Sequence, residues 1–274
     1  LLALHNQPVP TTIQTNPLKT TPAALRRELE AAGVEVTSHP WLEGCFTVTG
    51  TGDLEKLPAF TEGRCTVQDA AARLVSLAAA PDEHARVLDV CAAPGGKSFA
   101  LAMDMADGGD ILSCDVHPHK LKLIENGAQR LGLRSIRTTL ADGREEHAAW
   151  LGQADLVVAD VPCSGLGIIR KKPDIRYKDP AELAQLPPIQ KAILNNVCRY
   201  VRPGGVLVYA TCTILPEENE DQIAAFLASH PEFEKTPFTL PGIGGCDGAV
   251  TLYPHRTGTD GFFICRMRRS EEQL

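Results

Sequence analysis

The sequence predicts an α/β fold in which a Rossmann-like sheet follows a small α+β subdomain. Apolar strands alternate with amphipathic helices from residue 66 onward, which is typical of a parallel, doubly wound sheet. The first 65 residues instead follow the order β-α-β-β-α-β of a ferredoxin-like or RRM-like unit. Acidic residues end three successive strands of the predicted sheet, where such folds bind ligands. We therefore expect two domains, residues 1–65 and 66–274.

The elements of the first domain are predicted from helix-capping residues and from the alternation of apolar and polar residues in strands. Thr20 or Thr21 caps a helix that has Pro22 at its first position and ends at Gly33. Such a unit can bind RNA, but this one lacks the aromatic pair that stacks bases in an RNA-recognition motif. A packing or positioning role is therefore favoured. The other expected elements are strands over 11–16, 34–37, 45–49 and 64–67 and a short helix over 53–60.

The second domain is read from apolar runs and helical periodicity. Its strands should lie side by side and in parallel, so their carboxyl ends meet at one edge. The expected strands cover 86–91, 110–115, 135–140, 155–160, 205–211 and 261–267. The expected helices cover 67–80, 96–105, 118–131, 180–200 and 216–229.

Composition excludes several classes of protein. With 274 residues, 43% hydrophobic and 22% charged, the chain is neither fibrous nor disordered, and no apolar run is long enough for a transmembrane helix. The net charge of −7 argues against broad nucleic-acid binding, although residues 170–178 hold five basic side chains. The first residues carry neither an initiator Met nor the charged region of a signal peptide, so a fragment of a longer protein is expected. A monomer is favoured.

The nine cysteines form no C-x-x-C pair, so we expect no structural zinc and no other metal. Reduced thiols in a cytoplasmic protein fit this pattern best. Buried packing is expected for Cys45, Cys65, Cys114, Cys198, Cys246 and Cys265.

A cofactor loop is expected after the first strand of the sheet, over residues 89–98. Its small residues allow a tight turn, and the next helix offers free N–H groups at its start. It matches neither G-x-G-x-x-G nor a Walker A motif. Asp115, Asp142 and Asp160 end the next strands and together predict a nucleoside site. Taken singly, Asp115 could be a helix N-cap and Asp142 a turn residue.

Two cysteines follow neighbouring strands of the predicted sheet. Cys163 follows the strand that ends at Asp160, and Cys212 ends the next strand, so both thiols should lie at the cofactor edge. A thiol beside a nucleoside cofactor suits C5 methylation of a pyrimidine. Thiolate addition to C6 makes C5 nucleophilic toward the methyl group of S-adenosylmethionine. Asp160 is placed to activate the ring at N3 if it carries a proton.

These motifs resemble the bacterial Sun/Fmu-type ribosomal RNA (cytosine-C5)-methyltransferases of the NOL1/NOP2/Sun family. The resemblance extends from the N-terminal segment to Met267 and implies a Rossmann-like class I methyltransferase sheet. The resemblance implies that full-length members carry a further N-terminal helical domain, similar to the antitermination factor NusB, and we expect this sequence to be either a fragment without it or a shorter homologue. The motifs that carry the resemblance are residues 89–97, 160–165, 170–174, 209–213, 216–219 and 260–263.

The resemblance implies a role for each matching residue. Cys212 would be the nucleophile, Cys163 would assist product release, and Asp160 would lie near the methyl group and target base. Asp115 would hold the ribose and Asp142 the adenine. The S-adenosylmethionine site would be lined by Cys91, Ala92, Ala93, Pro94, Gly95, Gly96 and Lys97. RNA phosphates would be contacted by Arg170, Lys171, Lys172 and Arg176, which could otherwise form a solvated loop.

The expected activity is therefore methylation of cytosine C5 in RNA, with small-subunit ribosomal RNA as the first candidate substrate. Transfer RNA is the nearest alternative. A DNA methyltransferase would use Cys163 as its nucleophile instead, and a non-catalytic RNA-binding assembly factor would need neither thiol.

Overall fold

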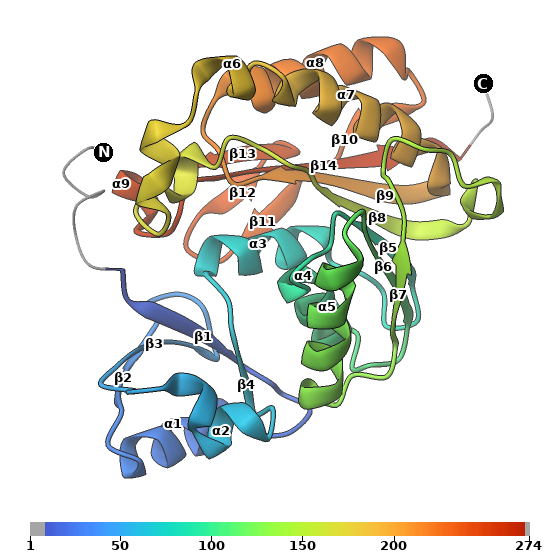
Figure 1. Cartoon of the computed structure of the whole chain (residues 1–274). Helices are drawn as coiled ribbons and strands as arrows, with labels where there is room; N and C mark the ends of the chain where they lie inside the picture. The colour runs from blue at the N-terminus through green and yellow to red at the C-terminus, as the bar shows by residue number, and fades with distance from the viewer. Residues whose placement is uncertain (1–8, 272–274) are drawn as a thin grey trace.

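The structure is a computed structural model that describes residues 9–271. Figure 1 shows a small N-terminal domain beside a larger domain built on one central sheet. The small domain has an antiparallel sheet in the order β2-β3-β1-β4, the order of a ferredoxin-like unit. Its strands are β1 (Thr11–Thr15), β2 (Glu35–Ser38), β3 (Cys45–Thr49) and β4 (Cys65–Val67).

The helices of the small domain cover one face of its sheet. Thr21 caps α1 (Pro22–Ala31) by accepting a hydrogen bond from the Ala24 N–H at 3.3 Å. The expected helix over 53–60 is replaced by a 3-10 turn, η2 (Leu54–Lys56), and the short α2 (Pro58–Thr61). The enclosed core includes Ile13, Leu25, Leu29, Phe46 and Val48.

The large domain contains an eight-stranded sheet in the order β10-β14-β9-β8-β5-β6-β7, with β13 also paired to β14. The five strands from β9 to β7 run parallel, as predicted. These are β9 (Val201–Thr211), β8 (Ala154–Asp160), β5 (Arg86–Val90), β6 (Asp110–Asp115) and β7 (Ile136–Leu140). The others are β10 (Phe233–Lys235), β13 (Ala249–Leu252) and β14 (Phe262–Arg269), and β11 (Phe238–Leu240) pairs with β12 (Gly244–Cys246) in a separate ribbon.

The expectation of an entirely parallel sheet is wrong at its C-terminal end. β14 runs antiparallel to β9, β10 and β13. Only residues 253–261, with the single-turn α9 (Pro254–Thr257), connect β13 to β14. This connection is too short for the crossover that parallel neighbours require, so the two strands pair as antiparallel partners.

Helices cover both faces of the large sheet (Figure 1). On one face lie α3 (Ala70–Ala79), α4 (Gly96–Asp104) and α5 (Pro118–Leu131), and on the other lie α7 (Leu186–Val197) and α8 (Glu220–Ser229). The predicted helix over 180–200 is divided into α6 (Pro180–Leu183), α7 and the 3-10 turn η6 (Cys198–Tyr200). The predicted helix over 216–229 is interrupted at Asn219, between η7 (Pro216–Glu218) and α8. α3 starts later than predicted because Asp69 is its N-cap and β4 continues to Val67.

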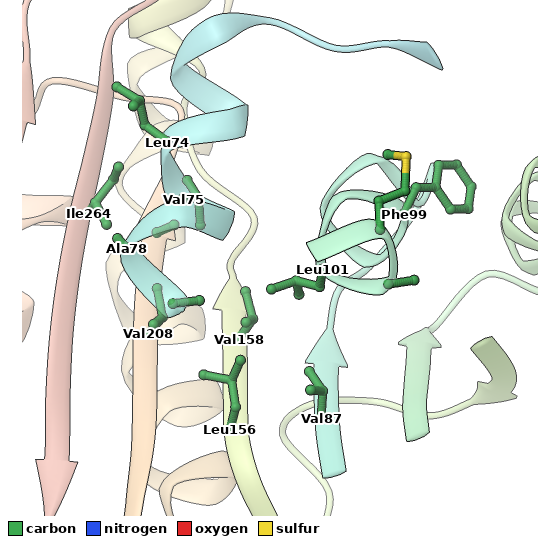
Figure 2. Packing of buried hydrophobic residues seen from close by; sticks show 14 of the residues in the cluster. Leu74, Val75, Ala78, Val87, Phe99, Leu101, Leu156, Val158, Val208 and Ile264 are labelled. Atoms are coloured by element: carbon green, nitrogen blue, oxygen red, sulfur yellow. The ribbon is translucent and has the colours of Figure 1, made fainter. Parts of the chain in front are cut away.

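The apolar core joins the sheet to its helices. Leu156 and Val158 of β8 belong to the cluster under α3–α5, whereas Val157 and Ala159 belong to the cluster under α7 and α8. This alternation follows from the two-residue period of a strand, and it fixes the register of the sheet. Figure 2 shows side chains of the first cluster, with Leu74, Val75 and Ala78 of α3 beside Val208 and Ile264.

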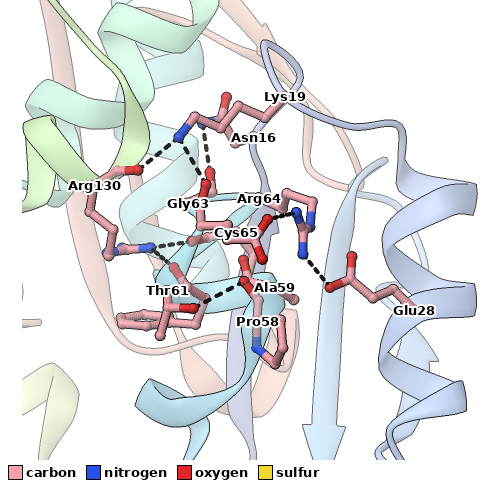
Figure 3. Close-up of polar contacts among 12 residues, drawn as sticks. Asn16, Lys19, Glu28, Pro58, Ala59, Thr61, Gly63, Arg64, Cys65 and Arg130 are labelled. Carbon is pink, nitrogen blue, oxygen red and sulfur yellow. Dashed lines mark hydrogen bonds and ion pairs between the residues drawn. The ribbon is translucent and has the colours of Figure 1, made fainter.

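The small domain is attached to the C-terminal end of α5 by buried polar contacts (Figure 3). The Arg130 guanidinium donates to the carbonyls of Phe60 and Cys65 at 2.6 and 2.9 Å and lies 3.8 Å from the centre of the Phe60 ring. Asn16 Nδ2 donates to the carbonyls of Gly63 and Leu131, both at 2.9 Å. Because α5 begins just after Asp115, these contacts tie the small domain to a helix that starts at the candidate site.

Candidate active site

The predicted cofactor loop is a tight turn between β5 and α4. Cys91 adopts φ = 62°, and the Ala92 N–H donates to the Cys114 carbonyl of the adjacent strand at 2.8 Å. Gly95 has φ = 107° and occupies the N-cap position of α4. A Cβ at Gly95 would lie 2.5 Å from the Phe99 ring, so this turn requires glycine for both conformation and space.

A pocket of about 440 Å³ opens at the carboxyl edge of the parallel strands. It brings together predicted site residues that are up to 121 positions apart, from Cys91 to Cys212. Ala92, Pro94, Gly95, Gly96 and Lys97 form the loop behind it and are not among its lining residues. The predicted residues that line it are Cys91, Ala93, Asp115, Asp142, Asp160, Cys163 and Cys212.

Two acidic residues lie on the side of the pocket formed by β6 and β7. Asp115 is nearly buried, and its Oδ1 accepts a hydrogen bond from the His117 N–H at 2.9 Å. The N-cap of α5 is His117, so the alternative interpretation of Asp115 as the helix cap is wrong. Asp142 makes the turn contact with the Arg144 N–H at 2.9 Å and also an ion pair with the Arg144 guanidinium at 2.5 Å. The Arg144 hydrogen bonds lower the pKa of Asp142, which keeps this carboxylate ionised.

The two predicted thiols lie in contact. Cys163 Sγ is 3.2 Å from Cys212 Sγ, and the Cys212 N–H donates to Cys163 Sγ at 3.3 Å. The hydrogen bond to Cys212 and burial raise the pKa of Cys163. The hydrogen bond from Cys163 lowers the pKa of Cys212, with a smaller contribution from Lys97 and against the effect of burial. The environment therefore favours a thiolate at Cys212 and a protonated thiol at Cys163.

Lys97 connects the cofactor loop to the thiols. Its Nζ donates to Asp160 Oδ2 at 2.5 Å and lies 5.5 Å from the centre of the Phe262 ring. Burial alone would lower the pKa of Lys97, but the nearby Asp160 carboxylate raises it overall. The ion pair thus keeps the Lys97 ammonium protonated within the site.

Several residues that line the pocket were not predicted from the sequence. His117, Lys120 and Arg144 contribute polar or charged groups, and Ile189 and Ile193 contribute an apolar wall from α7. The two isoleucines are four residues apart within the predicted helix 180–200 and therefore lie on the same face of it. This spacing could have predicted that they form one apolar surface together. The basic residues carried no such signal, because they reach the pocket from turns and a helix start.

The predicted basic residues have unequal surroundings. Lys171 Nζ donates to Asp69 Oδ2 at 2.7 Å and to Asp260 Oδ2 at 2.6 Å, and these carboxylates raise its pKa against the effect of burial. Lys171 therefore cross-links the loop to α3 and β14. Lys172 and Arg176 are exposed, and Tyr177 beside them is 88% exposed.

Within residues 9–271, no cluster of three or more His, Cys, Asp or Glu side chains could hold a metal ion, and no helix is long and apolar enough to cross a bilayer. All nine cysteines are free thiols.

A parallel sheet with acids at successive strand ends and a pocket at its carboxyl edge is typical of a Rossmann-like fold that binds a nucleoside. Similarity to a solved methyltransferase homologue identifies it as the class I methyltransferase type. The sequence model of the 16S rRNA methyltransferase RsmB/F family matches residues 76–268, and the chain belongs to this family. This result confirms the resemblance found in the sequence. Membership of a methyltransferase family agrees with the predicted methyl donor, S-adenosylmethionine.

Individual relatives agree with this assignment. A probable ribosomal RNA small subunit methyltransferase B from Bacillus subtilis is 38% identical over 97% of this chain and 61% of its own length. The crystal structure of the protein PH0851 superposes with a TM-score of 0.91 at 32% identity and covers 97% of this chain and 61% of that one. A methyltransferase homologue from Pyrococcus horikoshii gives a TM-score of 0.83 at 28% identity, with 97% and 88% covered. The chain thus spans about three-fifths of the length of the curated relatives it matches.

Proposed function

We propose that this chain methylates C5 of a cytosine in RNA, with 16S ribosomal RNA as the substrate, through a covalent bond between Cys212 Sγ and C6 of the ring. The observation that carries this proposal is the pair of thiols 3.2 Å apart in the pocket. Simple methyl transfer to a nucleophilic nitrogen or oxygen needs no thiol, whereas C5 of cytosine becomes nucleophilic only after addition at C6.

The pocket suits a nucleoside cofactor with a positively charged sulfonium. Asp115 offers a carboxylate to the ribose hydroxyls, and Asp142 lies at the end of β7 for the adenine. Ile189 and Ile193 supply an apolar surface for a flat ring. When bound, S-adenosylmethionine supplies an electrophilic methyl group. The cofactor loop closes this end of the pocket with its backbone, since Cys91 and Ala93 line it.

The thiol and charge arrangement supports thiolate attack by Cys212. Its Sγ accepts the hydrogen bond from Cys163, which lowers the pKa of Cys212 against the effects of burial and Asp160, with smaller help from Lys97. The thiolate therefore forms at lower pH than for an isolated cysteine. Asp160 is held by Lys97 through Oδ2, and its other oxygen can accept a hydrogen bond from the cytosine amino group. This contact would orient the ring and polarise it at N3. Activation at N3 needs a proton or a strong hydrogen bond, and the Lys97 ammonium beside Asp160 is the donor in this part of the site.

The covalent sequence balances without an oxidant or a metal ion. Cys212 Sγ forms a bond to C6, and the C5–C6 double-bond electrons make C5 the nucleophile that accepts the methyl group. A base then removes the C5 proton, the C5–C6 double bond re-forms, and the C6–S bond breaks to return the Cys212 thiolate. Cys163 lies within reach of the same atoms, and we assign it to this release step.

The RNA would approach along the loop that follows Cys163. Arg170, Lys172 and Arg176 supply positive charge for phosphates, and Lys171 stabilises the loop through its carboxylate partners. Tyr177 presents an exposed aromatic face on which an unpaired base can stack. If the target base is stacked, it must be flipped into the pocket.

A covalent-trapping experiment tests this proposal. Wild type, Cys212→Ala and Cys163→Ala are incubated with S-adenosylmethionine and unmodified small-subunit ribosomal RNA. Denaturing gels detect protein–RNA adducts, and mass spectrometry of digested RNA detects 5-methylcytosine. We expect an adduct that accumulates in Cys163→Ala and is absent from Cys212→Ala, and methylated cytosine with wild type.

Other patterns would refute parts of the proposal. An adduct in Cys212→Ala that is lost in Cys163→Ala would make Cys163 the nucleophile. Methylated nucleosides other than 5-methylcytosine would exclude the C5 reaction. Transfer RNA in a parallel reaction distinguishes the two RNA substrates, because only the true substrate yields both product and adduct.

A further inference from the structure

The loop that carries Cys163 is held from its buried side by two polar residues of other elements. The Ser164 N–H donates to Glu218 Oε2 at 2.9 Å, and Gln190 Nε2 donates to the Pro162 carbonyl at 2.9 Å. Gln190 Nε2 also donates to Glu218 Oε2 at 2.7 Å. The residues on both sides of Cys163 are therefore fixed by one pair of side chains, from η7 and α7.

The same network connects the two thiol loops. Ser164 Oγ donates to Thr213 Oγ1 at 2.8 Å, one residue beyond Cys212. Asn219 receives a hydrogen bond from Thr211 Oγ1 at 2.6 Å and donates to the Thr213 carbonyl at 3.2 Å. Cys163 thus lies between residues that Gln190 and Glu218 hold, and Cys212 lies between residues that Asn219 holds. The distance between the sulfurs therefore depends on both loops.

This arrangement lowers the stability of the folded state, so folding alone does not explain it. Glu218 is 2% exposed and Gln190 is fully buried. Among the described residues, neither Glu218 Oε1 nor Gln190 Oε1 has a hydrogen-bond partner. Buried carboxylate and amide oxygens without partners cost about 1–3 kcal/mol each. An apolar pair would fill this space at lower cost, but it could not hold the Ser164 N–H and the Pro162 carbonyl.

We infer that Glu218 and Gln190 are positioning residues that set the Cys163 thiol against Cys212, and that they thereby control release of the methylated RNA. The inference rests on the proposed role of Cys163 in release. Nucleophilic attack belongs to Cys212, which the pair reaches only through the hydrogen bond from Cys163, whereas release uses Cys163 itself. Release should therefore depend on the pair more than attack does. The Glu218 carboxylate also contributes to the raised pKa of Cys163, after the effects of Cys212 and burial, which helps to keep that thiol protonated as a donor to Cys212.

The test separates release from attack. Glu218→Gln keeps the size of the side chain and removes its charge, and Gln190→Leu removes both N–H donors with little change in volume. Glu217→Gln is the matched control, because it makes the same chemical change at the exposed neighbouring position of η7. Single-turnover reactions with S-adenosylmethionine and small-subunit ribosomal RNA give the rates of adduct formation and decay. Cys163→Ala and Cys212→Ala are run beside them.

We expect Glu218→Gln and Gln190→Leu to form the adduct within about threefold of the wild-type rate and to release product roughly 10- to 100-fold more slowly, the loss typical of a catalytic group misplaced by about 1 Å. Glu217→Gln should behave like wild type. The pH profile of release should shift in Glu218→Gln, which a merely structural role would not produce.

Each contrary result has one meaning. If both variants release product at the wild-type rate and Cys163→Ala still traps the adduct, the inference is overturned. An equal loss of adduct formation and release in both variants, with weakened cofactor binding by calorimetry, also overturns it and assigns the pair to folding. If Cys163→Ala itself releases product at the wild-type rate, the proposed role of Cys163 fails, and the inference fails with it.

Discussion

The burial of Asp89 predicts a pH dependence of the free energy of unfolding, and its magnitude follows from the structure. Its side chain is fully buried in β5, where Asp89 Oδ2 accepts a hydrogen bond from Ser98 Oγ at 2.5 Å and Oδ1 has no partner among the described residues. Burial raises the pKa of Asp89 to about 7, although Ser98 and the positive charge of Lys97 oppose the shift. The folded state therefore binds a proton at Asp89 in a pH range where the unfolded chain has lost it.

The sign and size follow from linkage between protonation and folding. Stability falls as pH rises from the unfolded pKa of 3.8 to the folded pKa of about 7, and it is flat above that. A shift of about 3 units corresponds to about 4 kcal/mol at high pH. Roughly 3 kcal/mol of this loss develops between about pH 5 and 8.5. Asp89→Asn removes the ionisation, but its buried amide N–H lacks a partner and costs about 1–3 kcal/mol.

Urea unfolding followed by circular dichroism from about pH 5 to 8.5 measures this effect. We expect the free energy of unfolding of Asp89→Asn, relative to wild type, to rise by roughly 3 kcal/mol across this range. Asp247→Asn, the same change at an exposed position, should follow wild type at every pH. A difference between Asp89→Asn and wild type that does not change with pH would refute the reasoning.

Two further predictions concern binding, and a third concerns stability. Asp115→Ala should weaken S-adenosylmethionine binding by about 10- to 100-fold, because a charged acceptor is worth about 1.5–3 kcal/mol, and should leave the melting temperature unchanged. Calorimetry checks this, and unchanged affinity would exclude the ribose contact. Lys172→Ala should weaken RNA binding and lower the slope of log K against log salt concentration by about 1. Lys171→Ala should instead lower the melting temperature, because Asp69 and Asp260 lose their partner. Identical behaviour of the two lysines would contradict their assignment.

The parallel part of the fold was predictable because its signals are local. The strands β5, β8 and β9 contain apolar runs, and Gly132 ends α5 in the left-handed conformation that the sequence indicates. The direction of β14 was not predictable in this way, since it depends on pairing with β9, about 50 residues earlier in the chain. The strands β10 and β11 have only three residues each, too few to show a period.

The candidate site was predictable wherever it depends on strand ends. Parallel strands bring their carboxyl ends to one edge, so Asp115, Asp160 and Cys212 could be placed together without coordinates. The sequence alone did not show which residues form ion pairs with the charged side chains. Lys171 looks like its neighbour Lys172 in the sequence, and only the fold shows that two carboxylates hold it. Glu218 likewise looks like one of several acids at a helix start until its burial is known.

The contact between the thiols follows from the register of β8 and β9. Asp160 is paired with Ala210 across these parallel strands, so Cys163 and Cys212 follow the last paired residues by three and two positions. The register alone would not show which of the two thiols is ionised. Their mutual hydrogen bond makes them different, because it lowers the pKa of Cys212, whereas the same hydrogen bond and burial raise the pKa of Cys163. One proton shared between two sulfurs therefore resides on Cys163. This division is what a covalent mechanism needs, since Cys212 must attack as a thiolate while Cys163 keeps its proton until release.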